Sequence, residues 1–244
     1  METHYSLRLF AWLSVLILLL AGQPAAAEPY TLTTENYPPY NMEDHDGNIT
    51  GVSTDIVTEL FRRAELEFEI ELLPWQRAYH SALVKSQHGV FSTSRTSERE
   101  TLFKWVGPLI RNHWVLLAKP EIAKQLNSLE DARNFRIGGY RGDATAIFLA
   151  NRGFELDLAS RDNVNALKLD SGRIDLWATG HLLGPYYANE QGVSGLVEVL
   201  TFHSVDMALA MNKDTPDELI ERLNSILRQM REDGTIDSIQ ASYQ

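Results

Sequence analysis

The chain has 244 residues and no cysteine, and its 33 acidic and 22 basic side chains give a formal net charge of −11. A net-acidic surface lacks the clustered cations that nucleic acid or anionic lipid requires. Without cysteine there are no disulfides, no thiolate chemistry and no thiol for lipid attachment. These features argue against a nucleic-acid-binding protein and against a small disulfide-stabilised scaffold.

Residues 1–27 have the three parts of a secretory signal peptide. A short polar start at 1–8 precedes an apolar core at 9–21, and three alanines at 25–27 end the segment. Small residues there are typical of a cleavage site, and the core is too short and wrongly flanked for a stable membrane span. The sequence predicts a mature chain that begins at Glu28, lies in the periplasm and does not insert into the membrane.

The mature chain opens with a β-branched run at residues 29–34, which predicts a strand. Pro38 and Pro39 end that strand, since proline supports neither a sheet ladder nor a helix interior. Tyr37 therefore lies on a stiff loop at the C-terminal end of a strand. It either stacks on a ligand or packs against the core, and the sequence leaves both roles open.

Apolar residues at helical spacing up to residue 64 predict a helix that Ser53 or Thr54 caps. A strand with alternating apolar and acidic residues follows, and Trp75 and Arg77 come directly after it. These two side chains either contact a ligand or form a packed helix start. We favour ligand contacts, because residues suited to recognition follow several successive strand ends.

The most informative stretch lies at residues 91–99. A strand end opens into small hydroxyl residues, including Ser92 and Ser94, and two arginines follow, the second being Arg99. Hydroxyl and N–H groups are directional donors, and a guanidinium offers a planar fork that matches a carboxylate. This stretch predicts an anion site. The alternative is a strand-to-helix turn in which Thr96 caps a helix and Arg99 pairs with a surface acid.

The second half repeats the alternation of strands and helices. A glycine-bearing turn at 138–142 leads into a helix through Leu149, a short strand is predicted at 174–178, and a long helix starts at Pro216. This order predicts an α/β fold with largely parallel sheets, in which ligands gather beyond the C-terminal strand ends. His181 has no partner at a metal-like spacing, so we expect no metal and no cofactor.

Four groups of residues, in this order along the chain, resemble the family 3 extracellular solute-binding proteins, the periplasmic receptors for polar amino acids. They are Glu35-Asn-Tyr-Pro-Pro-Tyr with Gly51-Val-Ser-Thr-Asp-Ile, residues 92–105, Gly139-Tyr-Arg-Gly-Asp-Ala-Thr, and Arg231-Glu-Asp-Gly-Thr-Ile. The resemblance spans essentially the whole mature chain. It implies the two-lobed, type II periplasmic binding protein fold, with two parallel-rich mixed sheets joined by two hinge strands.

The resemblance also implies a division of the chain. The first lobe is expected at residues 28–111 and 206–244, and the second lobe at residues 115–202. The hinge crossovers are expected near residues 111–114 and 202–206. A ligand would be held where the lobes meet.

Site roles follow from the same resemblance. Arg99 stands where the family's arginine grips the ligand α-carboxylate, and Tyr37 matches the family's stacking aromatic. Asp143 begins the second-lobe helix that offers donors to that carboxylate; being an acid, it either caps the helix or meets a cationic part of the ligand. The predicted ligand-binding set is Tyr37, Trp75, Arg77, Ser92, Ser94, Arg99, Asp143, Ala144 and Thr145.

One departure concerns the ligand's ammonium group. The family usually supplies an aspartate where this chain has Gly180, and losing a charge-assisted partner costs about 1.5–3 kcal/mol. Whether the ligand carries an α-ammonium is therefore open. Arg77, Arg95 and Arg141 favour a ligand with one carboxylate or with a second anionic group as well, and the alternative is that these arginines face solvent.

We therefore predict a periplasmic solute-binding protein that captures a small polar carboxylate-bearing ligand, an amino acid or a related compound, for ABC-type import. The alternative is a sensor whose partner is a kinase rather than a permease. A cyclohexadienyl dehydratase-like enzyme of the same fold would need a cleft acid; residues 179–183 contain none, and the nearest downstream glutamate is Glu190. We expect no catalysis, and a monomer by default.

Overall fold

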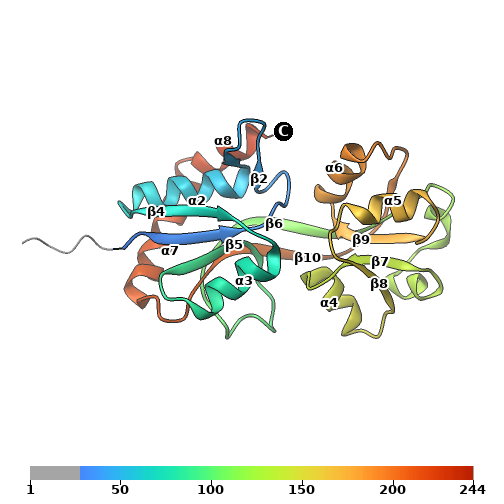
Figure 1. The fold of residues 1–244 in the computed structure, drawn as a ribbon, viewed down its shortest axis with the longest axis horizontal. Coiled ribbons are helices and arrows are strands. Elements are labelled where there is room, and N and C mark those ends of the chain that lie inside the picture. The colour runs from blue at the N-terminus through green and yellow to red at the C-terminus, as the bar shows by residue number, and fades with distance from the viewer. Residues whose placement is uncertain (1–27, 244) are drawn as a thin grey trace, which may run out of the picture.

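The computed structural model describes residues 28–243, so the predicted signal peptide lies outside the described residues. The described chain forms two lobes that lie side by side (Figure 1). Two long strands run from one lobe into the other, β6 (Lys104–Ala118) and β10 (Val197–Met211), with 15 residues each. These strands place the facing surfaces of the two lobes against each other.

The first lobe is assembled from both ends of the described chain. Its strands and helices are β1 (Tyr30–Thr34), β2 (Met42–Glu43), β3 (Ile49–Thr50), α2 (Val52–Arg63), β4 (Phe68–Leu72), α3 (Trp75–Val84), β5 (His88–Ser94), α7 (Asp217–Glu232) and α8 (Thr235–Ala241). The second lobe holds two short 3-10 turns at Ala123–Gln125 and Leu129–Asn134, then β7 (Ile137–Tyr140), α4 (Ala144–Ala150), β8 (Leu156–Ala159), α5 (Val164–Asp170), β9 (Leu176–Gly180) and α6 (Leu183–Glu190).

Eight strands form one hydrogen-bonded sheet in the order β4-β1-β5-β10-β6-β9-β7-β8. Within the lobes, β1 pairs in parallel with β4 and β5, and β7 pairs in parallel with β8 and β9. Strands β6 and β10 pair antiparallel with each other and with their outer neighbours. Because these two strands run through both lobes, the two expected sheets are continuous. The α/β periplasmic binding protein fold is confirmed.

The segments predicted as hinge crossovers lie within β6 and β10 and pair with each other, Arg111 opposite Asp206 and Trp114 opposite His203. Strand β10 bonds to the first-lobe strand β5 only from Met207 onward, and β6 bonds to the second-lobe strand β9 only from Trp114 onward. Among residues 28–243, no third strand pairs with the segments between these pairings. We keep them as the proposed boundary between the lobes.

Each lobe has an apolar core, and one cluster of buried residues also joins Tyr37, Tyr40 and Met207 to the second lobe. In the first lobe, α2 and α7 turn their apolar stripes toward the sheet, as their sequence spacing requires. The buried residues that these helices and the sheet bring together include Leu32, Ile56, Leu60, Phe61, Phe91, Leu223, Leu227 and Met230. In the second lobe, the sheet packs on residues that include Leu116, Ile137, Leu149, Leu169 and Trp177.

The start of α2 differs from the prediction. Gly51, with φ of 122°, is the N-cap, and no side chain caps the helix, so the expected cap at Ser53 or Thr54 is wrong. A Cβ at Gly51 would lie 2.5 Å from the Tyr40 carbonyl oxygen. Glycine is required there for both its positive φ and this close approach.

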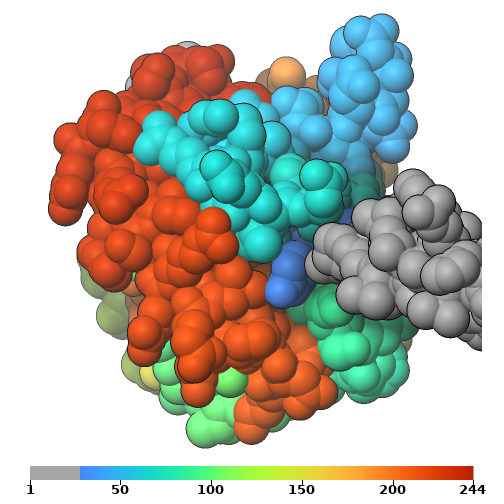
Figure 2. Space-filling view, turned by 90° about the vertical axis from the view of Figure 1, so that its left-hand side faces the viewer, coloured from blue at the N-terminus to red at the C-terminus, as the bar shows by residue number. Residues whose placement is uncertain are grey.

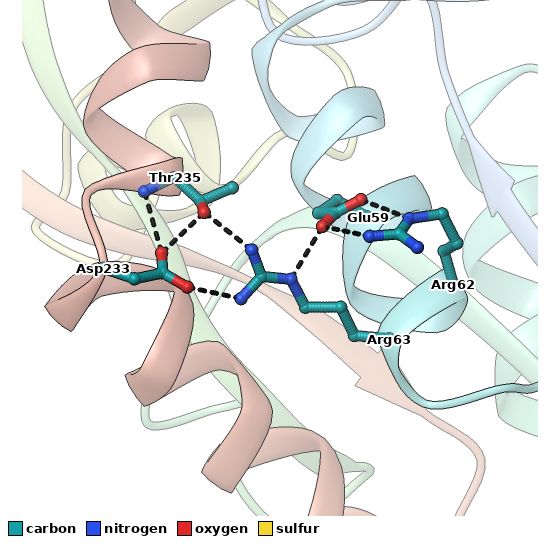
Figure 3. Close-up of polar contacts among 5 residues, drawn as sticks. All are labelled: Glu59, Arg62, Arg63, Asp233 and Thr235. Atoms are coloured by element: carbon teal, nitrogen blue, oxygen red, sulfur yellow. Dashed lines mark hydrogen bonds and ion pairs between the residues drawn. The ribbon is translucent and has the colours of Figure 1, made fainter.

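The end of the first lobe joins distant parts of the chain. Figure 2 shows the α7 and α8 segments beside the α2–β4 segment on this face. Arg63, at the end of α2, donates to Asp233 Oδ2 at 2.6 Å and to Thr235 Oγ1 at 2.7 Å, where α7 gives way to α8 (Figure 3). Its Nε donates to Glu59 Oε1 at 2.7 Å. One guanidinium therefore ties α2 to the C-terminal helices.

Candidate ligand-binding site

Hydrogen bonds at the ends of strands and helices connect the two lobes. Trp75 Nε1, at the start of α3, donates to the Gly142 carbonyl at 3.2 Å. Tyr187, on α6, donates its hydroxyl to the Asn36 carbonyl at 2.9 Å. Each bond links a residue of the first lobe with one of the second, so the lobes are closed on one another.

Arg99 lies between the lobes with only 7% of its surface exposed. Its Nη1 donates to the Ser94 carbonyl at 3.3 Å, and its Cζ lies 5.1 Å from the Trp75 ring centroid and 5.3 Å from that of Tyr79. Among residues 28–243, no carboxylate lies within 4.0 Å of this guanidinium. Burial lowers the pKa of Arg99, because desolvation disfavours the charged form. The charges of Asp143, Glu35 and Glu98 raise that pKa, so the structure holds a buried cation with acids nearby but, within residues 28–243, none in ion-pair contact.

The alternative interpretation of this stretch is wrong. The segment after β5 forms turns rather than a helix, so Thr96 caps no helix. The surface ion pair is made by Arg95, whose Nη2 lies 2.5 Å from Glu100 Oε1. Arg99 instead faces the junction of the lobes, as an anion site requires.

Two interlobe cavities with clusters of charged side chains border this junction, beside a third, of about 420 Å³, whose lining includes Trp75, Arg99 and Gly142. We call the first the acidic cavity; it has a volume of about 450 Å³ and is lined by residues that include Glu35, Tyr37, Tyr140, Asp162 and Tyr187. We call the second the arginine crevice; it has a volume of about 560 Å³ and its lining includes Arg95, Arg99, Arg111, Arg152, Trp114 and Phe148. Both cavities take side chains from each lobe.

The acidic cavity contains two carboxyl groups that the sequence analysis did not single out. Burial raises the pKa of Glu35 well above its ordinary value, the charge of Asp143 raises it further, and a hydrogen bond with Tyr140 acts in the opposite direction. Burial also raises the pKa of Asp162, to about 6. The one available signal was position, since Glu35 directly follows β1 and Asp162 follows β8.

Asp162 is held in place by three donors from its own lobe. Its Oδ1 accepts from Asn165 Nδ2 at 3.0 Å and from Trp177 Nε1 at 2.9 Å, and its Oδ2 accepts from Thr179 Oγ1 at 2.9 Å. These bonds lower its pKa and oppose the effect of burial. Asp162 therefore presents a fixed carboxyl group at the edge of the cavity.

The position of the expected aspartate is filled by other groups. A Cβ at Gly180 would lie 3.1 Å from both Asn112 Oδ1 and the Tyr37 hydroxyl. Asn112 Nδ2 donates to that hydroxyl at 3.2 Å, and the Tyr37 ring stacks on Tyr40 with centroids 5.7 Å apart. Tyr37 thus packs against the core and also lines the acidic cavity. Acid groups reach the junction from other loops.

Asp143 is the N-cap of α4, as one of the two predicted roles requires. Its Oδ2 accepts from the backbone N–H of Thr145 at 2.6 Å. Ala144 and Thr145 are buried, with 5% and 2% exposed. The backbone N–H of Thr145 is therefore already bonded to Asp143 and is not free for a ligand. Ala144 lines the arginine crevice.

The remaining predicted site residues lie at different depths. Ser92 has a left-handed φ of 55° and donates its hydroxyl to Asn41 Oδ1, and Ser94 is partly buried beside Arg99. Trp75 is buried at the contact between the lobes. Arg77 is exposed on α3 and lines neither interlobe cavity. The structure brings Trp75, Ser94 and Arg99 together and leaves Arg77 apart from them.

Two features of the described chain limit the chemistry of the site. In residues 28–243, no three His, Cys, Asp or Glu side chains are grouped so that they could hold a metal ion. No helix in the same part of the chain has the length and apolarity needed to cross a bilayer. The junction offers hydrogen-bond donors, guanidinium groups, carboxyl groups and aromatic rings, which suit reversible binding of a polar molecule.

Several proteins of known structure have a fold similar to that of this chain. A histidine kinase sensor domain with similarity to periplasmic binding proteins has a TM-score of 0.81 and 19% identity, covering 88% of this chain and 96% of its own. An ancestral arginine-binding protein bound to arginine has a TM-score of 0.76 and 20% identity, covering 88% and 97%. The substrate-binding protein of an ABC uptake transporter from Streptococcus pneumoniae, with bound histidine, has a TM-score of 0.76 and 17% identity, covering 88% and 92%.

These likenesses show the fold. A search of curated protein sequences finds no match. Residues 31–244 match the family described as bacterial extracellular solute-binding proteins, family 3, which covers nearly all of the chain after the predicted signal peptide. The resemblance inferred from the sequence motifs is confirmed, and the chain belongs to the family 3 bacterial extracellular solute-binding proteins.

Proposed function

We propose that this protein is a periplasmic binding protein that captures a small carboxylate-bearing solute between its lobes, with Arg99 as the carboxylate partner. The observation that carries the proposal is the buried guanidinium of Arg99, which has no carboxylate within 4.0 Å in residues 28–243. An unpaired buried charge costs several kcal/mol, and a ligand carboxylate offsets that cost. Trp75 and Tyr79 wall the guanidinium and shield the pair from water.

Capture works through the equilibrium between open and closed lobes. The bonds from Trp75 to Gly142 and from Tyr187 to Asn36 form only when the lobes meet. A ligand that contacts both lobes has a higher affinity for the closed form and shifts the population toward it. A micromolar dissociation constant, equivalent to about −8 kcal/mol, is expected for so small a solute.

The ligand-bound form is expected to serve ABC-type import, with a permease as partner. A sensory role is the second candidate, and the high structural similarity to a kinase sensor domain favours it. Uptake of the labelled ligand by cells that lack this protein separates the two roles. Import requires that uptake falls in those cells, whereas a sensor leaves uptake unchanged and alters the downstream signalling response.

Binding without catalysis is the expected activity, although the structure changes one argument for it. Residues 179–183 contain no acid, but Glu35 and Asp162 supply carboxyl groups to the acidic cavity from other loops. Incubation of the purified protein with prephenate or arogenate checks the expectation. Recovery of both compounds unchanged supports binding alone, and their loss would establish a dehydratase.

A thermal-shift screen tests the proposed ligand class. Amino acids, dicarboxylates, opines and polyamines are compared, because a ligand that binds only the folded state raises the melting temperature. Arg99→Ala should abolish the shift for every carboxylate, whereas Arg173→Ala, at an exposed arginine outside both cavities, should preserve it. A carboxylate whose shift survives Arg99→Ala would disprove the role of Arg99.

A further inference from the structure

The acidic cavity and the arginine crevice carry opposite charge. The acidic cavity is lined by Glu35, Asp162 and Glu190 with the single cation Arg161. The arginine crevice has four guanidinium groups against three carboxylates, in a protein whose formal net charge is −11. Burial and the charge of Arg152 lower the pKa of His203, which favours its neutral form. The crevice therefore has the opposite charge to the protein as a whole. Each of its arginines can be checked for an acidic partner.

Two of the four arginines in the crevice already have acidic partners. Arg95 Nη2 lies 2.5 Å from Glu100 Oε1, and Arg111 Nε lies 3.1 Å from Asp206 Oδ1. The third carboxylate, Glu98, has its pKa lowered mainly by hydrogen bonds from its own backbone N–H and from the Thr96 hydroxyl, and less by the charge of Arg99. Within residues 28–243 it makes no ion pair at 4.0 Å or less. The internal pairing therefore stops short of neutralising the crevice.

Arg99 and Arg152 are the two guanidiniums that remain. Neither has a carboxylate oxygen within 4.0 Å in the part of the chain from 28 to 243. Arg99 comes from the first lobe, and Arg152 comes from the turn that follows α4 in the second lobe. Arg152 is held at the wall of the crevice, because its Nη1 donates to the Phe148 carbonyl at 3.3 Å and its Cζ lies 3.4 Å from the Phe148 ring centroid.

The rest of the crevice suits a short organic linker between two charged groups. Trp114, Phe148 and His203 form a connected aromatic wall, with Phe148 and His203 stacked at 4.6 Å between centroids and Trp114 at 4.9 Å from His203. Such a wall accepts methylene groups. Hydroxyls of Ser97 and Ser204 also line the crevice. The Ser97 hydroxyl bonds to Glu98, whereas the Ser204 hydroxyl, 2.8 Å from His113 Nδ1, can accept from that nitrogen and donate to a ligand carboxylate.

We infer that the ligand is a small dicarboxylate that lies in the arginine crevice, with one carboxylate on Arg99 of the first lobe and the other on Arg152 of the second lobe. This inference rests on the proposed function, because both use Arg99. A dianion that pairs with one cation on each lobe gains both ion pairs only when the lobes are closed. It therefore links the chemistry of the ligand to closure directly.

Calorimetric titration of the purified exported protein tests the inference with matched compounds. Linear dicarboxylates from oxalate to adipate are compared with their monoamides, which keep the shape of each acid and lose one charge. The best dicarboxylate should bind roughly 10- to 100-fold more tightly than its monoamide, because a charge-assisted pair is lost. Its affinity should also fall more steeply with added salt than that of the monoamide.

Substitutions then assign the two ends of the ligand. Arg152→Gln, at an exposed position, should weaken the dicarboxylate to the level of its monoamide and leave the monoamide unchanged, and Arg173→Gln should affect neither compound. Arg99→Lys should weaken both compounds, since it keeps the charge and removes the planar fork.

The possible results separate this inference from the proposed function. Binding of an amino acid or a monocarboxylate that depends on Arg99, with no preference for dicarboxylates and no effect of Arg152→Gln, would retain the proposed function and overturn the dicarboxylate inference. If no carboxylate binds the wild-type protein, or if binding is the same in Arg99→Lys, both fail. A dicarboxylate that depends on both arginines supports both.

Discussion

At the scale of single residues, the junction of the lobes combines groups whose charged forms are disfavoured by burial. Arg99 is buried without an acidic partner in the described chain, and Glu35 and Asp162 are carboxyl groups whose pKa values are raised by burial. Perturbed groups of this kind gather at functional sites. Because their pKa values differ between the folded and unfolded chain, these groups also make the free energy of unfolding depend on pH.

Asp162 gives the clearest case. Its pKa in the folded protein is about 6, against an ordinary value of 3.8. Between about pH 4 and pH 6 the unfolded chain loses this proton while the folded protein keeps it, so this group lowers the stability as pH rises and the loss persists above pH 6. A difference of about two pKa units corresponds to about 3 kcal/mol at most.

Asp162→Asn should remove this contribution, because the amide does not titrate. Urea unfolding at a series of pH values from 4 to 7 should show a wild-type stability that falls relative to that of the variant as pH rises. An Asn side chain keeps an acceptor for Trp177 Nε1, so the variant is expected to fold. A constant difference between the two proteins across this range would contradict the raised pKa.

At the scale of secondary structure elements, the C-terminal end of α2 contains a left-handed residue that is not glycine. Glu65 has φ of 49°, and Leu66 donates its N–H to the Phe61 carbonyl at 3.1 Å, which is the closing bond of a Schellman turn. Glu65→Gly should raise the free energy of unfolding by about 1 kcal/mol, because glycine adopts this conformation without strain.

Chemical denaturation of the Glu65→Gly variant measures the effect. Glu67→Gly is the matched control, since Glu67 is equally exposed and does not have a positive φ. The control should be destabilised or unchanged. Equal effects of the two substitutions would show that the gain does not come from the backbone conformation.

The contact between α2 and the C-terminal helices supports a second prediction at this scale. Arg63 bonds to Asp233 and Thr235 across the junction of α7 and α8, whereas the neighbouring Arg62 bonds only to Glu59 on its own helix (Figure 3). Arg63→Ala should lower the free energy of unfolding by about 1 kcal/mol, since it removes a cluster of charge-assisted bonds between distant segments. Arg62→Ala should have no measurable effect, and an equal loss in both variants would contradict the bridging role.

At the scale of the whole molecule, the closed form depends on a few bonds between the lobes. Trp75→Phe removes the donor to the Gly142 carbonyl and keeps an aromatic ring beside Arg99. One lost hydrogen bond of about 1 kcal/mol should shift the equilibrium toward open lobes and weaken the ligand about fivefold. Calorimetry measures the affinity, and small-angle scattering measures the accompanying increase in the radius of gyration.

Trp105→Phe is the control for this substitution. Its Nε1 donates to the Glu100 carbonyl at 3.1 Å within the first lobe, so the variant loses a similar bond that does not connect the lobes. Its ligand affinity should stay near that of the wild type while its stability falls. If both variants lose affinity equally, the Trp75 bond does not control closure.

The amino-acid sequence by itself determined the local pattern of this protein. Alternating strand and helix periodicities established the α/β class, and Pro216 marked the start of α7 as predicted. Asp143 also followed a local rule, because an acid before a helix caps it. These features depend on residues only a few positions away along the chain, so they can be predicted from the sequence.

Only the tertiary structure decided the charge of the site. It brought Glu35 and Asp162 to one cavity from loops more than a hundred residues apart in the sequence. It also paired Arg95 and Arg111 with acids and left Arg99 and Arg152 without them in the described chain. Arg111 and Asp206 meet because β6 and β10 pair with each other, and whether Arg99 and Arg152 meet an acid depends on how the two lobes are placed. No spacing along the sequence encodes these distances.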